Sequence, residues 1–228
     1  MKKIGLIGGI TPQSTIMYYQ VLNDLAQQKY GGGHTAKVLV NSVDFGEISA
    51  LQVAGKWDVL DNIMANAAIS LERAGASCII ICANTMHLCV DAVKNKVSVP
   101  IIHIAEATAE AIIEKKLKKI LLLGTKYTME KKFYTDVLKS FGIEVVIPNE
   151  EDRDVVHQII YDELAKGIIN KKSKETYLAI IKKAQAKGVE GVVLGCTEIP
   201  LLVKQEDVLI PIFDTTTIHA IKAFNLSV

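Results

Sequence analysis

Short runs of Val, Ile and Leu alternate along the chain with longer segments in which apolar residues recur at helical spacing. In residues 153–168, for example, apolar positions repeat every three or four residues, with charged residues between them. The alternation is typical of an α/β fold, a mostly parallel sheet covered by helices. We expect eight strands, at residues 3–7, 36–41, 78–82, 101–104, 119–123, 144–147, 191–194 and 210–213.

The strand pattern occurs twice. Residues 75–87, GASCIIICANTMH, align without a gap with residues 188–200, GVEGVVLGCTEIP, and a Pro-headed strand follows each segment. The alignment places Ala83 opposite Cys196. We therefore expect two similar lobes built on one βαβ plan, residues 1–98 with 208–228 and residues 99–207. Because ligands of open α/β sheets bind beyond the carboxyl ends of the strands, both turns should face one cleft between the lobes.

Charge and cysteine content narrow the range of possible functions. The 26 Lys and Arg residues balance 25 Asp and Glu residues, so no long-range field favours nucleic acid or an anionic membrane, and a small-molecule partner is expected. The four cysteines show neither metal-ligand spacing nor the framework of a secreted disulfide protein. The opening MKKIGLIGGI is interrupted by glycines and is interpreted as a first strand. No apolar run has the length of a spanning helix, which indicates a cytoplasmic protein.

Cys196 is the leading candidate for chemistry. It follows an apolar strand and Gly195, and it precedes Thr197 and Glu198, which resemble the start of a helix. A thiol at a helix N-terminus is expected to have a lowered pKa, which favours the reactive thiolate. The alternative is a buried structural cysteine, since free cysteines are commonly buried.

The matching turn carries Asn84 and Thr85, which are suited to binding a substrate carboxylate or to capping the helix expected at residues 86–93. His87 is a proton shuttle or, slightly favoured, a partner of a backbone carbonyl. Because side chains alternate along a strand, Cys82 should point away from the face used by Ala83. Cys89 is interpreted as a packing residue.

Two further loops can contribute to a site. Gly8 and Gly9 end the first strand before Ser14 and Thr15, so this loop can wrap closely around an anionic group. The GxGxxG spacing is absent, which argues against a dinucleotide. Thr125 follows a later strand and Gly124, either as a ligand for the cleft or as ordinary turn chemistry.

The ordered set of turns resembles the aspartate/glutamate racemase family, specifically its broad-specificity, cofactor-independent amino-acid racemases. The similarity rests on IGLIGG near the N-terminus, on CANTMH at residues 82–87 and on GCTE at residues 195–198. It extends to SVDF at residues 42–45, to LLGTKYTMEKKFY and to the closing PIFD. The single motifs are weak, but their order is specific.

This resemblance implies two pseudo-symmetric lobes, each supplying one cysteine to flank the α-carbon of an acidic or similar polar amino acid. One thiolate removes the α-proton and the opposite thiol returns a proton, without pyridoxal phosphate, metal or another cofactor. The family's second cysteine falls on Cys196, whereas its first falls on Ala83, which has no proton to transfer. The implied substrate ligands are Gly9, Gln52, Asn84, Thr85, Thr125, Thr197 and Glu198. Related enzymes are commonly dimers, so a homodimer is expected.

Two alternatives remain open at this point. Single-cysteine relatives include decarboxylases of arylmalonates, in which a small residue replaces the first cysteine and the lone thiol protonates an enolate. A non-catalytic amino-acid-binding protein is the other alternative, with the cleft kept and half of the chemistry lost.

Overall fold

Every strand pair in the structure is parallel, as the alternation of apolar runs and amphipathic segments predicted. The computed structural model describes residues 1–228 and divides the chain into two compact units. The first unit consists of Met1–Ile104 and His219–Val228, and the second of Ala105–Ile218. No helix combines the length and the apolar character needed to cross a membrane.

The sheet of the first unit has the strand order β2-β1-β3. Its strands are β1 (Ile4–Gly8), β2 (Val38–Ser42) and β3 (Cys78–Ile81). Its helices are α1 (Pro12–Tyr30), α2 (Phe45–Val53), α3 (Trp57–Arg73), η1 (Thr85–Cys89, 3₁₀) and α4 (Val90–Lys94), with most of α11 (Thr215–Ser227).

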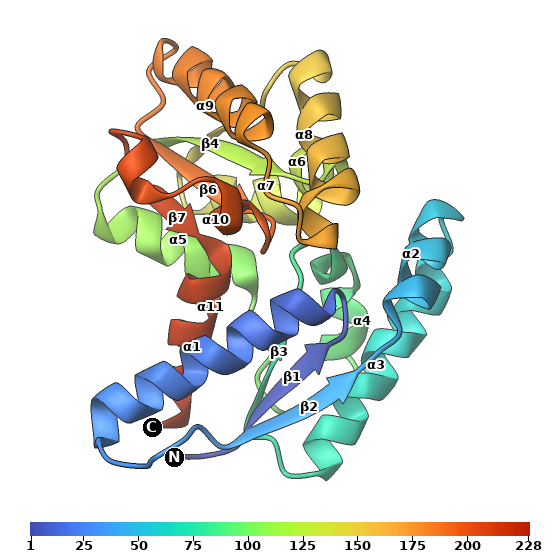
Figure 1. The fold of residues 1–228 in the computed structure, drawn as a ribbon. Helices are drawn as coiled ribbons and strands as arrows, with labels where there is room; N and C mark the ends of the chain where they lie inside the picture. The colour runs from blue at the N-terminus through green and yellow to red at the C-terminus, as the bar shows by residue number, and fades with distance from the viewer. The chain divides into compact units, whose positions relative to one another are not determined.

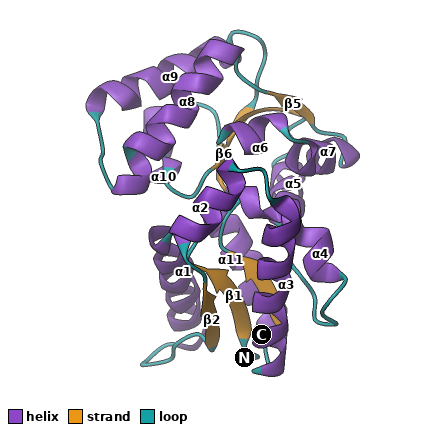
Figure 2. Cartoon of the chain, turned by 90° about the vertical axis from the view of Figure 1, so that its right-hand side faces the viewer, coloured by secondary structure: helices purple, strands orange, loops and turns teal.

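Alternating side chains of this sheet enter two different cores. Leu6 and Ile80 pack with α1 and α11, whereas Ile7 and Ile81 pack with α2 and α3. Figure 2 shows β1 and β2 between α1 and α3. The same alternation places Cys82 in the α1 and α11 core, but it places Ala83 on the other side. The prediction that these neighbouring residues face opposite ways is confirmed.

The sheet of the second unit has the order β5-β4-β6-β7. Its strands are β4 (Lys119–Gly124), β5 (Glu144–Val146), β6 (Gly191–Gly195) and β7 (Ile212–Asp214). Its helices are α5 (Ile104–Glu114), α6 (Lys126–Glu130), α7 (Lys132–Ser140), α8 (Glu150–Asp162), η2 (Leu164–Lys166, 3₁₀), α9 (Lys171–Gln185), α10 (Ile199–Leu202) and η3 (Gln205–Asp207, 3₁₀). Helices α8 and α9 cover one face of the sheet and α5 lies on the other (Figure 1).

The internal repeat is visible in this strand order. The chain order of β1, β2 and β3 produces the spatial order β2-β1-β3, and β4, β5 and β6 produce β5-β4-β6 in the same way. After β3, Ile101 forms a single parallel bridge to Ile79 at the position that β7 occupies beside β6. The two units are therefore variants of one plan, as the gapless alignment of the two segments predicted.

The structure corrects two of the expected segments. Residues 101–104 form one bridge rather than a strand, because α5 begins at Ile104. The helix expected at residues 153–168 begins earlier, at Glu150 after the Asn149 cap, and it ends at Asp162. The chain then continues as the 3₁₀ helix η2. Helical geometry ends at Gly167, whose φ of 75° lies in the left-handed region.

The units also divide the chain differently from the expected lobes. Residues 99–104 group with the first unit, because Ile102 donates its N–H to Ile79 of β3. Residues 208–218 group with the second unit, because β7 pairs with β6.

Candidate functional site

Cys196 lies in the turn that leaves the carboxyl end of β6. Its Sγ donates a hydrogen bond to Oε2 of Glu198 over 2.9 Å, and the Thr197 hydroxyl donates to the same oxygen over 2.8 Å. All three residues are buried, with Glu198 only 4% exposed. Glu198 is the only Asp, Glu, Lys or Arg among the buried side chains of the chain. The Glu198 carboxylate thus accepts hydrogen bonds from the side chains of both Cys196 and Thr197.

The expected lowering of the Cys196 pKa is wrong. Burial raises this pKa well above the ordinary value, and the negative charge of Glu198 raises it further. The helix that follows the turn, α10, has only four residues and so provides a weak dipole to oppose these effects. Cys196 is therefore a protonated thiol at neutral pH, placed to donate a proton.

Thr125 leaves β4 at the same edge of the sheet. Gly124 pairs in register with Gly195, so the turns that follow the two strands are adjacent. A Cβ on Gly195 would lie 2.9 Å from the Leu123 carbonyl oxygen and 3.0 Å from Cγ2 of Thr128, so only glycine allows this approach. The Thr125 hydroxyl accepts the N–H of Thr128 over 3.2 Å as the N-cap of α6.

Tyr161 of α8 belongs to this neighbourhood and was missed in the sequence. Burial raises its pKa to about 12, and the negative charge of Glu198 contributes to the rise. The helical periodicity of α8 predicts an inward face, but it does not show that one partly buried tyrosine of that helix approaches the thiol.

In the first unit, Ala83, Asn84 and Thr85 follow β3 and are all buried. The Asn84 backbone is already helical, and its side chain makes no capping hydrogen bond to η1, so the capping alternative for this residue is wrong. Gln52, at the end of α2, donates to Sδ of Met86 over 3.1 Å, which places its amide beside η1. The unit thus brings Gln52 to the helix that begins at Thr85.

His87 has a structural position. Its Nδ1 lies 2.8 Å from the Ala83 carbonyl oxygen, and its Nε2 accepts the N–H of Ile104 over 3.2 Å. Burial and the nearby His103 lower the pKa of His87 to about 3, so the ring is neutral. The favoured interpretation, a histidine that pairs with a backbone carbonyl, is confirmed.

The loop after β1 is held by its own side chains. Gly9 has a φ of 84°, and a Cβ there would lie 2.1 Å from the Val43 carbonyl oxygen. Its N–H donates to Oγ1 of Thr15 over 2.8 Å. Ser14 donates to the Cys82 carbonyl oxygen over 2.5 Å, which ties α1 to the end of β3. Contact of Gly9 with a substrate remains a prediction.

The Ala83 turn contains no group that replaces the absent thiol. Cys82 is fully buried in the opposite core, and burial raises its pKa. Cys89 packs in the α3 core, where burial raises its pKa as well. The Ser14 hydroxyl is occupied by a carbonyl oxygen. The Cys196 turn, by contrast, holds a thiol and a carboxylate in direct contact at the strand end itself.

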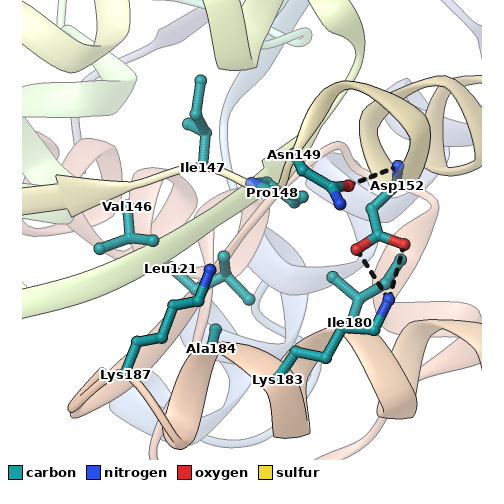
Figure 3. Close-up of a pocket in the computed structure, with 10 residues that line it drawn as sticks. All are labelled: Leu121, Val146, Ile147, Pro148, Asn149, Asp152, Ile180, Lys183, Ala184 and Lys187. Carbon is teal, nitrogen blue, oxygen red and sulfur yellow. Dashed lines mark hydrogen bonds and ion pairs between the residues drawn. The ribbon is translucent and has the colours of Figure 1, made fainter.

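A surface pocket of the second unit, with about 380 Å³ of open space, lies elsewhere (Figure 3). None of the predicted site residues lines it. Asn149 uses its Oδ1 to accept the N–H of Asp152, and Asp152 forms an ion pair with Lys183 over 3.0 Å. The polar side chains of Asn149, Asp152 and Lys183 in this pocket thus interact with neighbouring residues of the pocket. The lining also includes the apolar side chains of Leu121 and Ile180.

Two parallel sheets of related strand order, each flanked by helices, define the class as a two-unit α/β fold. The family model for Asp/Glu/hydantoin racemases matches residues 7–223, so the chain belongs to this family of isomerases. It is 28% identical over 165 residues to the broad specificity amino-acid racemase RacX of Bacillus subtilis, an alignment that covers 69% of each protein.

Solved structures agree with this assignment. A Yersinia pestis protein assigned to the Asp/Glu racemases superposes with a TM-score of 0.94 at 47% identity, covering 100% of this chain and 99% of that one. An aspartate racemase homologue from Pyrococcus horikoshii gives a TM-score of 0.88 at 42% identity, with 100% and 99% covered.

Proposed function

We propose that this protein is a racemase-type enzyme that moves the α-proton of an acidic or polar amino acid through Cys196 on one face of the α-carbon. The single observation that supports this proposal is the contact between the Cys196 thiol and the Glu198 carboxylate at the end of β6, with Ala83 at the equivalent end of β3.

The proposed step is a proton transfer with no change of oxidation state. For deprotonation, the thiol proton passes to Oε2 of Glu198, and the Cys196 thiolate then takes the α-proton, so that a C–H bond breaks and an S–H bond forms. Return of the proton reverses both transfers. Because the raised pKa keeps the proton on sulfur at rest, protonation of a carbanion is the easier direction.

The carbanion formed in this step needs strong stabilisation. Hydroxyl and amide groups of Asn84, Thr85, Thr125 and Thr197 are the proposed donors for the substrate carboxylate. The chain has no buried Lys or Arg side chain, and the proposed stabilisation of the negative charge uses hydroxyl and N–H groups. We also expect a homodimer, on the family resemblance.

Incubation of the enzyme with each enantiomer of glutamate and of glutamine in deuterated water tests the proposal. One enantiomer should exchange its α-proton faster than the other, while net racemisation stays slow, because only one face has a proton-transfer group. Cys196→Ser should abolish the exchange. Absence of α-proton exchange with every acidic and polar amino acid tried would refute the proposal.

A second reaction is favoured by the small residue at position 83. The side chain of Ala83 leaves one thiol to protonate an enolate, which is the arrangement expected of a decarboxylase for disubstituted malonates. Release of carbon dioxide from such a malonate, lost in Cys196→Ser, would assign this reaction instead. The two reactions share the thiol and differ in the bond that breaks before protonation.

A further inference from the structure

Three buried histidines lie together in the first unit, and the proposed reaction uses none of them. The ring centroids of His87 and His103 are 4.9 Å apart, and those of His87 and His219 are 5.5 Å apart. His87 and His219 are fully buried. The chain has no group of three or more His, Cys, Asp or Glu residues suited to a metal ion, so the cluster needs another explanation.

Two of these rings bind main-chain atoms on either side of His103. His219 lies with Nε2 2.8 Å from the Ile102 carbonyl oxygen. His87 accepts the N–H of Ile104 at Nε2, while its Nδ1 faces the Ala83 carbonyl oxygen. The other nitrogen of His219, Nδ1, lies 2.8 Å from the Tyr18 hydroxyl of α1.

The hydrogen-bond partners fix the tautomers. A carbonyl oxygen only accepts, so His87 must carry its proton on Nδ1 and His219 must carry its proton on Nε2. The remaining nitrogens then accept from Ile104 and Tyr18. Both rings are neutral, because burial lowers each pKa to about 3. Every nitrogen of the two rings has a partner only in this one protonation pattern.

The location of these bonds gives them a specific role. The chain leaves the first unit after Ile104 and returns to it at His219, inside α11. Both imidazoles therefore hydrogen-bond the main chain where it leaves the first unit. His219 is also the residue at which the chain returns to this unit. His87 also bonds the carbonyl of Ala83, the residue at the candidate site.

We propose that His87 and His219 are positioning residues, two imidazoles of fixed tautomer that join the Ala83 turn, residues 102–104 and helices α1 and α11 into one hydrogen-bonded set. The set holds the candidate turn in register with both chain segments that connect the units. This role does not depend on the reaction proposed above.

Nitrogen-resolved NMR of the full, unliganded chain tests the tautomers. At neutral pH we expect His87 to be protonated on Nδ1 and His219 on Nε2, with no interchange. The opposite tautomer at either residue would overturn the proposal, and this measurement requires no variant that must fold.

Two substitutions at position 87 separate the two bonds of that ring. His87→Asn keeps a donor near Nδ1 but removes the acceptor for Ile104, so amide exchange at Ile104 should rise about tenfold. His87→Gln keeps an acceptor near Nε2 but removes the donor to Ala83. Exchange should then rise by a similar factor at the residue 87 amide, which bonds the Asn84 carbonyl oxygen.

The control is Ser227→Ala, which removes a buried hydroxyl that donates to the Phe224 carbonyl oxygen over 2.8 Å in the same unit. It should change neither amide selectively. If both position 87 variants and the control accelerated the same amides equally, the histidines would contribute only general stability, and the positioning role would be wrong.

Discussion

The Cys196 thiol keeps its proton because it is buried against a carboxylate, not because of its place in a turn. A reactive cysteine usually has a lowered pKa, provided by a helix N-terminus or a neighbouring cation. Here the negative Glu198 and the loss of water act in the opposite direction. Cys196 is thus better suited to give a proton than to attack as a nucleophile.

Glu198→Gln should lower the pKa of Cys196, although burial should keep it above the ordinary value. The reason is that the variant removes the nearby negative charge but leaves the desolvation unchanged. The ultraviolet absorbance of the thiolate, titrated with pH and corrected with Cys196→Ala, measures this change. The α-proton exchange rate should fall by about tenfold or more, because the thiol loses its proton acceptor.

Glu190→Gln is the matched control for this charge change. Glu190 precedes the other end of β6, where its carboxylate accepts the N–H groups of Lys118 and Lys119. This variant should leave the Cys196 titration as in the parent protein. An unchanged Cys196 pKa in Glu198→Gln would show that the carboxylate does not act on the thiol.

Ala83→Cys should raise net racemisation relative to single-enantiomer exchange, because it supplies a second thiol at the position in the first repeat that is equivalent to Cys196. The Ala83 side chain lies in the core that includes Ile81 and Met86, so the larger side chain should cost about 1 kcal/mol of stability. Ala83→Ser is the control, since it adds a hydroxyl that does not ionise near neutral pH. Amino-acid binding without any α-proton exchange in Ala83→Cys would favour the binding-protein alternative.

At the residue scale, the sequence predicted positions better than it predicted protonation. The alternation along β3 correctly separated Cys82 from Ala83, and the gapless repeat placed Ala83 and Cys196 at equivalent strand ends. The pKa of Cys196 was predicted in the wrong direction. A sequence does not show that Glu198 turns back to the thiol two residues before it.

Among the secondary-structure elements, the strands formed by continuous apolar runs were predicted best. Seven of the eight expected strands are present, with small shifts of their ends. The segment at residues 101–104 failed because an apolar run beside a proline is equally compatible with a single bridge followed by a helix. The end of α8 was missed because Ile168 continued the apolar period beyond Gly167, although Ile168 is 50% exposed.

Gly195→Ala should destabilise the protein by about 1 to 3 kcal/mol and reduce α-proton exchange. The added methyl group would press on the Leu123 carbonyl oxygen and on Thr128, and it would displace the turn that carries Cys196. Chemical denaturation measures the loss of stability. Gly33→Ala is the control, because a Cβ there meets no atom within 4 Å. Equal stability of the two variants would contradict the close packing of β4 and β6.

At the scale of the whole molecule, the repeat predicted two units of related topology, but it did not predict where the chain passes between them. The passages occur at the start of α5 and inside α11 rather than at residues 98 and 208. Apolar periodicity does not mark a unit boundary within a continuous helix. The histidines bonded beside these passages are separated by more than a hundred residues in sequence, so their clustering appears only in three dimensions.

The same cluster should make the first unit sensitive to acid. In the folded chain, burial lowers the pKa of His87 and His219 to about 3 and that of His103 to about 4, from 6.5. The unfolded chain therefore binds more protons between these values, and stability must fall as the pH falls from about 6.5 toward 4. At about pH 5 each histidine should cost about 2 kcal/mol. Two further groups act on this cluster: the charge of Lys94 also lowers the pKa of His103, and the Tyr18 hydroxyl bonds Nδ1 of His219.

Trp57, the only tryptophan in the chain, begins α3 and reports unfolding of the first unit by fluorescence. The urea midpoint measured by Trp57 fluorescence should decrease when the pH is lowered from 7 to 5 in the parent protein. It should decrease less in His87→Asn, which has one histidine fewer to protonate. Ser227→Ala should lower the midpoint at both pH values and keep the parent's pH dependence, since it removes no imidazole. A parent midpoint that does not change with pH would mean that the imidazoles are already charged, or hydrated, in the folded unit. The tautomer pattern proposed for His87 and His219 requires both rings to be neutral, so the same result would also argue against that pattern.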